Sequence, residues 1–378
     1  MVKNIRWTTE CQSPSVMTMT TDSTPRSGAH HHRADARDWS APPPRSSARA
    51  FHRTLPGYAP TRLAALPEVA RDLGLGRVLV KDETNRLGLP AFKVLGASWA
   101  VHQALSALEV TGEPRPPRLT TATDGNHGRA LARTGALLDI PATIFIPDGV
   151  HPQAADAIRA EGAEVVATGL DYDGAVAAAT AYAHETGALL VQDTAWPGYE
   201  EIPTWIVEGY RTLVEEVDEQ LAADGRAPDL VVIPVGVGSL AQGVIEHYRA
   251  PGRAERPALL AVEPVTAACV LASRQAGEPL SVATTATTMA GLNCGTPSSA
   301  AWPALSKGLD AVVAVTDSDA RAAQASLRAA GIDAGPCGAA PLAGLLAMAA
   351  TGALADLNLP ADATVVLLCT EGAAANPA

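Results

Sequence analysis

The 378-residue chain is predicted to be a two-domain α/β protein built on doubly wound parallel sheets. From about Phe51 onward, short runs rich in Val, Ile and Leu alternate with Ala-rich helical stretches, and this alternation is typical of parallel sheets. Nearly all of these runs are continuously apolar, as strands covered by helices on both faces must be. The length is also ample for a large core, in one two-lobed enzyme or in two domains.

Each apolar run in turn is a candidate strand, and the loop that follows it is a candidate site. Ligands of open parallel sheets bind beyond the carboxyl ends of the strands, so the loops that follow the strands are where functional residues are expected. The predicted strands are Arg77–Lys81, Arg118–Ala122, Ala142–Ile146, Ala163–Ala167, Ala188–Gln192, Leu230–Pro234, Leu259–Val262, Ala311–Val315 and Thr364–Leu368.

Residues 1–50 differ in composition from the rest of the chain. They are rich in Ser, Thr, Pro and Arg and contain few large apolar side chains. Such a segment cannot bury enough apolar surface to offset its ordering entropy, so it is predicted to be a disordered tail. The run His30–His32 lies in it and is not interpreted as a metal site.

The overall composition excludes several classes of function. The net charge of −12 argues against a nucleic-acid partner, because phosphate binding requires clustered Lys and Arg. No run approaches the roughly 20 apolar residues of a membrane span, and no secretory signal is evident, so a cytoplasmic location is expected. The five cysteines are too scattered for a disulfide scaffold or a zinc site, and no metal is expected.

Lys93 stands out because it is one of only four lysines and has apolar neighbours, in the sequence Ala-Phe-Lys-Val-Leu-Gly. It follows the loop after strand Arg77–Lys81, where the next helix is expected to begin. Apolar surroundings and the positive end of a helix dipole both disfavour an ammonium, which would lower its pKa and favour attack on a carbonyl. The alternative is a lysine on an amphipathic helix with its head in water. Lys81, beside Asp82 and Glu83, is interpreted as a salt-bridged strand end.

Two further loops carry polar side chains at strand ends. Residues Thr123–Gly128 read Thr-Asp-Gly-Asn-His-Gly and precede a helix; their free N–H groups could bind an anion, or the segment is an ordinary strand-to-helix turn. Asp193 follows strand Ala188–Gln192, where a carboxylate suits acid/base chemistry or caps a helix.

A glycine-rich loop follows strand Leu230–Pro234 and opens another helix. The glycines let the backbone approach a ligand closely, and the next N–H groups with the Ser239 hydroxyl can surround a phosphate. The loop also fits the G-x-G-x-x-A dinucleotide pattern, with Glu263 placed to bind a ribose. An NAD-dependent oxidoreductase using Gly236-Val237-Gly238 is therefore an alternative, although it leaves Lys93 without a role.

Taken in order, these loops resemble those of the fold type II pyridoxal phosphate enzymes (the tryptophan synthase beta-like superfamily), and most closely the diaminopropionate ammonia-lyase family. The resemblance runs from Phe51 to about Gly372. Each motif is short, and their joint occurrence in order carries the signal. The matching segments are Gly88–Gly96, Thr123–Gly128, Gln192–Trp196, Gly198–Trp205, Ala290–Gly295 and Thr370–Gly372.

The resemblance implies a cofactor, pyridoxal 5'-phosphate, and a role for each cofactor-binding loop. Lys93 would form the Schiff base, and Asn126 would bind the phenolic oxygen. Thr370, or less readily Cys369, would meet the pyridine nitrogen. The phosphate would be held by Gly236, Val237, Gly238, Ser239 and Leu240.

The resemblance also implies the reaction. Asp124 and Asp193 match the family's two acid/base aspartates, which serve opposite faces of the substrate and let the family accept both enantiomers. The expected reaction is α,β-elimination of 2,3-diaminopropionate to pyruvate and two ammonia. The family's architecture implies a large domain of residues 51–95 and 205–378 with a small domain, 96–204, inserted in it. A homodimer is the expected assembly.

The sequence departs from the family pattern in two places. Residues 335–339 read Gly-Pro-Cys-Gly-Ala where the family has Gly-Glu-Ser-Gly-Ala, and Ala373 replaces an acid. These changes put the substrate in doubt, so a β-replacement or dehydratase enzyme acting on a serine-like substrate is kept as an alternative. Cys269 and Cys294 fall where the family can have a cysteine pair; in a cytoplasmic protein they are expected to be thiols.

Overall fold

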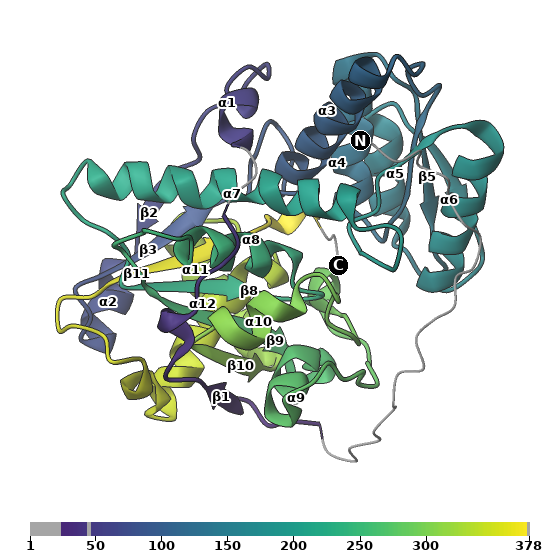
Figure 1. The fold of residues 1–378 in the computed structure, drawn as a ribbon. Helices are drawn as coiled ribbons and strands as arrows, with labels where there is room; N and C mark the ends of the chain where they lie inside the picture. The colour runs from purple at the N-terminus through teal and green to yellow at the C-terminus, as the bar shows by residue number, and fades with distance from the viewer. Residues whose placement is uncertain (1–23, 44–46, 376–378) are drawn as a thin grey trace.

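The computed structural model describes residues 24–43 and 47–375, and these form two sheets surrounded by helices (Figure 1). The strands are β1 (His30–His32), β2 (Leu63–Ala65), β3 (Arg77–Asp82), β4 (Leu119–Ala122), β5 (Ala142–Ile146), β6 (Glu164–Ala167), β7 (Leu189–Leu190), β8 (Leu230–Pro234), β9 (Ala258–Pro264), β10 (Ala311–Val315) and β11 (Thr364–Cys369).

Most helices follow a strand and return the chain to the start of the next one. The α-helices are α1 (Ala48–His52), α2 (Pro67–Leu73), α3 (Val94–Thr111), α4 (Asn126–Leu138), α5 (Pro152–Ala160), α6 (Tyr172–Thr186), α7 (Glu201–Ala222), α8 (Ser239–Tyr248), α9 (Cys269–Ala276), α10 (Trp302–Gly308), α11 (Asp317–Ala329) and α12 (Pro336–Ala350). Short 3₁₀ helices span Ala36–Asp38, Val265–Ala267, Ala290–Leu292, Ala353–Leu357 and Ala373–Ala375.

The larger sheet has the order β1-β10-β9-β8-β11-β3-β2, and the smaller one the order β6-β5-β4-β7. All pairings are parallel except those of the two outermost strands of the larger sheet, β1 and β2. The long helix α7 runs along the larger sheet and packs on α8 and on α3, which lies beside the smaller sheet (Figure 1). The prediction of an α/β architecture with parallel sheets is confirmed.

Both faces of the larger sheet are buried, as the continuously apolar strands predicted. In β8, Val231 and Ile233 point into the core beneath α7 and α8, whereas Leu230 and Val232 point into a second core beneath α12. Side chains alternate across a strand, so a strand covered on both faces must be apolar at every position.

All nine predicted strands are present, with ends that differ by up to two residues. The two strands that sequence analysis missed, β1 and β2, are three residues long, pair antiparallel and lie at the edges of the larger sheet. A strand this short carries no readable periodicity, and its pairing depends on the neighbour that tertiary structure supplies.

The prediction of a disordered tail over residues 1–50 is wrong for the part of it that is described. Residues 1–23 and 44–46 lie outside the described residues, but β1 pairs with β10 and the following 3₁₀ helix Ala36–Asp38 contacts α10. Buried Arg249 donates to the Ala36 carbonyl and to Asp310, and Arg37 donates to the same Asp310 carboxylate. Backbone pairing and arginine contacts replace the apolar burial that the composition lacks.

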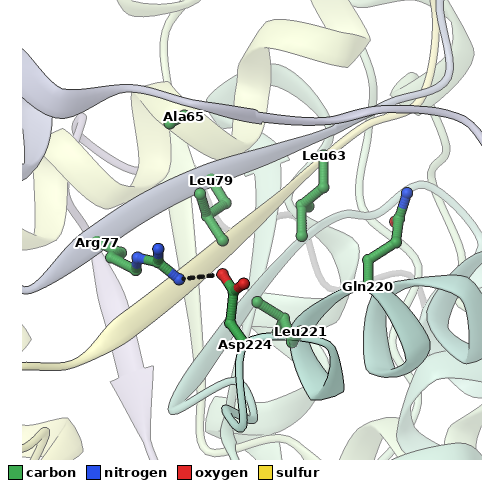
Figure 2. A pocket seen from close by; sticks show the side chains of 7 residues that line it. All are labelled: Leu63, Ala65, Arg77, Leu79, Gln220, Leu221 and Asp224. Carbon is green, nitrogen blue, oxygen red and sulfur yellow. Dashed lines mark hydrogen bonds and ion pairs between the residues drawn. The ribbon is translucent and has the colours of Figure 1, made fainter.

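A cavity of about 330 Å³ lies between the β2–β3 edge and the C-terminal part of α7. Figure 2 shows Arg77 and Asp224 pointing toward one another across it, with 2.9 Å between Nη1 and Oδ2. Arg77 is the first residue of β3, so this cavity lies near the end of the strand opposite to the loop that leads to Lys93. Over the described parts of the chain, none of the helices is both long and apolar enough to cross a membrane.

Candidate active site

Lys93 is the residue immediately before α3, at the end of the loop that leaves β3. Its side chain is about one quarter exposed, and Nζ donates a 2.7 Å hydrogen bond to Oδ2 of Asp193. The Phe92 and Tyr210 rings flank the ammonium, with their centroids 5.6 and 5.9 Å from Nζ. The side chain is therefore partly exposed, and its amine is paired with a carboxylate and flanked by two aromatic rings.

The backbone around Lys93 is held by the residues that follow β11. Phe92 N–H donates to the Thr370 carbonyl at 3.2 Å, and Gly372 N–H donates to the Pro90 carbonyl at 2.8 Å. The buried Thr370 thus contacts the Lys93 loop through its main-chain carbonyl. Cys369 is also buried, and its thiol lies 3.6 Å from the Glu371 carbonyl oxygen.

The pKa of Lys93 is raised in this structure, so the expectation that it is lowered is wrong here. Burial lowers the pKa of Lys93, but the adjacent Asp193 carboxylate raises it and determines the direction. For Asp193, burial has the opposite effect and raises the pKa, but the Lys93 ammonium outweighs it and holds the pKa of Asp193 below its ordinary value. The two residues are 100 positions apart in the sequence, so the apolar neighbours of Lys93 gave no sign of this partner.

The Thr123–Gly128 segment, in which β4 leads into α4, brings Asp124 and Asn126 to the site around Lys93. The Thr123 hydroxyl accepts from the N–H groups of Gly125 and Gly128, and a Cβ at position 128 would lie 2.2 Å from the Thr123 methyl group. Desolvation by the surrounding protein raises the pKa of Asp124, and the Asp193 carboxylate adds to this, although Asp124 keeps an exposed face.

The glycine-rich loop after β8 forms a backbone turn that opens α8. Gly238 has φ +104°, and a Cβ there would lie 2.6 Å from Leu305, so only glycine fits without strain. At position 236 a Cβ would come within 2.9 Å of the Cys294 sulfur. The Ser239 hydroxyl donates to the Asp193 carbonyl at 3.3 Å, which places this helix N-terminus beside the Lys93 partner. Val237 lies between the two glycines, and Leu240 is the second residue of α8.

Four residues that sequence analysis left without a role also belong to the site. The Nε2 atom of His127 lies 2.7 Å from the Val191 carbonyl oxygen, and its Nδ1 atom lies 3.9 Å from the Asp193 carboxylate. The Tyr172 hydroxyl accepts from a glutamine amide at 2.9 Å, and burial followed by the Asp193 carboxylate raises its pKa well above the ordinary value. Tyr210 flanks Lys93, and Glu371 accepts from Asn126 at 2.8 Å. Of the four, only His127 and Glu371 stood inside a recognised motif, and neither tyrosine carried a local signal.

The alternative of a dinucleotide site is not supported by the position of Glu263. Its carboxylate is fully buried and accepts from the N–H groups of Val270 and Leu271, both at 2.8 Å. Because both carboxylate oxygens already accept hydrogen bonds from the first turn of α9, they are not available to a ribose. Cys269 and Cys294 are both free thiols.

Lys81 is salt-bridged, as interpreted, but its partner comes from α7 and is not the adjacent Asp82. It is fully buried, and Nζ donates to Glu216 of α7 at 2.6 Å, whereas Asp82 pairs with Arg62. Lys3 lies outside the described residues, and Lys307 lies in the last turn of α10. Where the chain is described, no cluster of His, Cys, Asp and Glu side chains could hold a metal ion.

Comparison with known proteins assigns the family. The model of the family described as "Pyridoxal-phosphate dependent enzyme" matches residues 54–371. The chain is a pyridoxal phosphate-dependent enzyme. It is 39% identical over 288 residues to a diaminopropionate ammonia-lyase of Salmonella typhimurium, a match that covers 71% of each chain, and it belongs to that family. A diaminopropionate ammonia-lyase of Escherichia coli is 36% identical over 86% of this chain and 87% of its own.

A solved structure of the Escherichia coli diaminopropionate ammonia lyase, in complex with an aminoacrylate-PLP azomethine reaction intermediate, has a similar fold. It aligns with a TM-score of 0.81 and 34% identity, over 92% of this chain and 94% of that one. The fold class and the cofactor predicted from sequence are thereby confirmed.

The residues of this chain fit pyridoxal phosphate. Lys93, a partly exposed lysine, offers an amine for the aldehyde. At the same edge of the sheets lie a turn that requires glycine at position 238 and a helix N-terminus suited to a phosphate.

Proposed function

We propose that this enzyme eliminates ammonia from 2,3-diaminopropionate, and that pyruvate and a second ammonia follow on hydrolysis. The observation that carries the proposal is the pair of carboxylates at the Lys93 amine. Asp193 contacts Nζ at 2.7 Å, and Asp124 is close enough for the two carboxylates to affect each other. The relatives named diaminopropionate ammonia-lyase support the same substrate.

The residues divide the work as follows. Lys93 would be the attachment point for the cofactor aldehyde, and the segment Gly236, Val237, Gly238, Ser239 and Leu240 would hold its phosphate. The bound cofactor supplies an electron sink for the charge left when the α-proton departs. Asn126 would donate to the phenolic oxygen, and Thr370 would meet the pyridine nitrogen.

Asp124 and Asp193 move the protons, one for each face of the substrate. A base must be ionised to accept the α-proton, and an acid must be protonated to release the β-amino group as ammonia. The pKa values of the two carboxyls lie on opposite sides of their ordinary value, raised in Asp124 and lowered in Asp193. This difference suits Asp193 as proton acceptor and Asp124 as proton donor for one enantiomer, and the two roles exchange for the other. Both carboxylates also complement the second ammonium of the substrate.

The principal alternative is β-replacement or dehydration of a serine-like substrate, because those reactions use the same cofactor contacts. The discriminating experiment is pyruvate release from D- and L-2,3-diaminopropionate beside L-serine and O-acetyl-L-serine. Turnover of the diaminopropionates with little from serine is expected. Reaction of serine or O-acetylserine alone would show that the lyase assignment is wrong.

The role of Lys93 is tested by borohydride reduction of the holoenzyme followed by peptide mapping. The cofactor is expected on Lys93, and Lys93→Ala should lose both the label and turnover. Lys307→Ala, at an exposed position in α10, is the matched control and should keep both. Residual turnover by Lys93→Ala would contradict the scheme.

The two aspartates are separated by their effects on the two enantiomers. Asp193→Asn and Asp124→Asn should each reduce kcat for one enantiomer by at least about a hundredfold more than for the other, since a positioned base contributes 10²–10⁴-fold. Equal losses would contradict one base per face. We further propose a cytoplasmic homodimer, with residues 51–95 and 205–378 as the large domain and 96–204 as the small one.

A further inference from the structure

Glu371 lies where three segments of the site meet, and sequence analysis gave it no role. It follows β11 and is 3% exposed. Its backbone forms an isolated bridge with Ala91, two residues before Lys93. Its carbonyl accepts from Gly335 N–H at 2.9 Å, just before α12. The residue therefore joins the Lys93 loop to the segment in which this chain departs from the family pattern.

The Glu371 carboxylate makes contacts in two directions. Oε1 accepts from the N–H of Cys337, in the first turn of α12, at 3.2 Å. Oε2 accepts from Nδ2 of Asn126, in the first turn of α4, at 2.8 Å. A carboxylate is favoured at the start of α12 because the helix dipole is positive there. Glu371 thus connects the larger sheet to the loop of the smaller sheet that carries Asn126.

The contact with Glu371 determines which end of the Asn126 amide faces it. An ionised carboxylate only accepts hydrogen bonds, so the amide must present its NH₂ group and not its oxygen. One of the two Nδ2 hydrogens is used in this way, and the other remains available in the plane of the amide. An amide held by a neutral partner could rotate and present its oxygen instead, which would repel a phenolate.

We propose that Glu371 is a positioning residue that fixes the Asn126 amide so that its second Nδ2 hydrogen is directed to the phenolic oxygen of the cofactor. This inference rests on the proposed role of Asn126 as the donor to that oxygen. It also explains how the site keeps a carboxylate at the start of α12, where Pro336 has replaced the acid of the family pattern.

The test is a double-mutant cycle on cofactor retention. Glu371→Gln, Asn126→Ala and the double variant are prepared as holoenzymes, and the dissociation constant of pyridoxal phosphate is measured by dilution. Each single variant should weaken binding about tenfold, because a hydrogen bond to a charged group contributes about that much. The double variant should bind about as weakly as either single one. Glu371→Gln should also shift the visible absorbance of the bound cofactor.

Two controls separate positioning from general damage. Asp310→Asn removes another buried carboxylate that accepts from a backbone N–H, that of Leu259, at the amino end of β10. It should lower stability and leave the spectrum unchanged. The pair Asn126→Asp with Glu371→Gln reverses donor and acceptor, so it should recover stability while cofactor binding stays weak.

Each outcome is decisive. The positioning role would be overturned if the dissociation constant of the double variant rose by the product of the two single increases. An unchanged spectrum in Glu371→Gln would overturn it as well. So would wild-type cofactor affinity in the reversed pair, which is the deciding measurement if Glu371→Gln alone does not fold. Borohydride labelling of Lys93 in every variant separates these results from failure of the proposed function, in which the wild-type enzyme itself would not be labelled.

Discussion

Glu216 of α7 is the centre of a buried ionic cluster, and its removal should be among the most damaging changes outside the active site. The side chain is fully buried. Burial raises the pKa of Glu216, but its hydrogen bonds and charge pairing with Arg86 and Lys81 lower it to about 2. Its carboxylate accepts from Lys81 Nζ at 2.6 Å, Arg86 Nη1 and Nη2 at 2.8 Å, the Tyr58 hydroxyl at 2.7 Å and Thr61 N–H at 3.2 Å.

The expected loss follows from the charges that Glu216→Gln leaves behind. Lys81, Arg86 and Glu83 all have fully buried side chains, so the variant encloses two positive charges and one negative one. Breaking a buried ion pair by removing one partner typically destabilises by about 3–5 kcal/mol, because the remaining charge is uncompensated. Since Arg86 lies in the loop that leads to Lys93, the loss is expected to loosen the attachment of that loop as well.

The assay is equilibrium urea unfolding of the variant beside Glu219→Gln. Glu219 lies one turn further along the same helix and pairs with Arg49 and Arg53, but its side chain is 57% exposed. An exposed pair contributes about 0–1 kcal/mol, so this control should change stability little. Equal losses in the two variants, or a loss below about 1 kcal/mol in Glu216→Gln, would refute the account of the cluster.

The pH dependence provides a second test of the same change. Burial already lowers the pKa of Lys81, against the raising effect of Glu83 and Glu216, and removing Glu216 lowers it further. With its folded pKa below the unfolded value, Lys81 is protonated more in the unfolded state. The stability of Glu216→Gln should therefore rise between pH 7 and 9, by at most about 1.4 kcal/mol per pH unit, relative to Glu219→Gln. A flat profile would contradict the argument.

Three other changes have definite expected outcomes. Gly209→Ala should destabilise by about 1–3 kcal/mol in urea unfolding, because the new Cβ would lie 2.4 Å from the Leu95 carbonyl where α7 crosses α3; unchanged stability would show that the crossing is not tight. Burial raises the pKa of Glu263 to about 8, so this carboxyl makes stability fall as pH rises from about 4.5 to 8. Glu263→Gln should remove that component, and an unaltered profile would contradict it. Burial lowers the pKa of His52 to about 4, so stability should fall as pH drops from 6.5 to 4, and His52→Gln should flatten this part of the curve.

The sequence by itself predicted nine of the eleven strands of the described residues and the loops that carry most of the candidate site. A parallel strand buried on both faces is apolar at every position, which is a local property that can be read without a structure. Glycines at turns and polar residues at strand ends are equally local. Lys93, the Thr123–Gly128 loop and the glycine turn after β8 were therefore found where the structure has them.

Only the tertiary structure determined the partners of these residues. Asp193 pairs with Lys93 across 100 positions, and Glu371 pairs with Asn126 across 245. No periodicity in a chain encodes such a pair, so neither the direction of the Lys93 pKa nor the contacts of Glu371 were visible in the sequence. The edge strands β1 and β2 depended in the same way on neighbours that only the folded sheet provides. Short-range patterns determine which elements form, while charge and hydrogen-bond partners depend on how those elements are brought together.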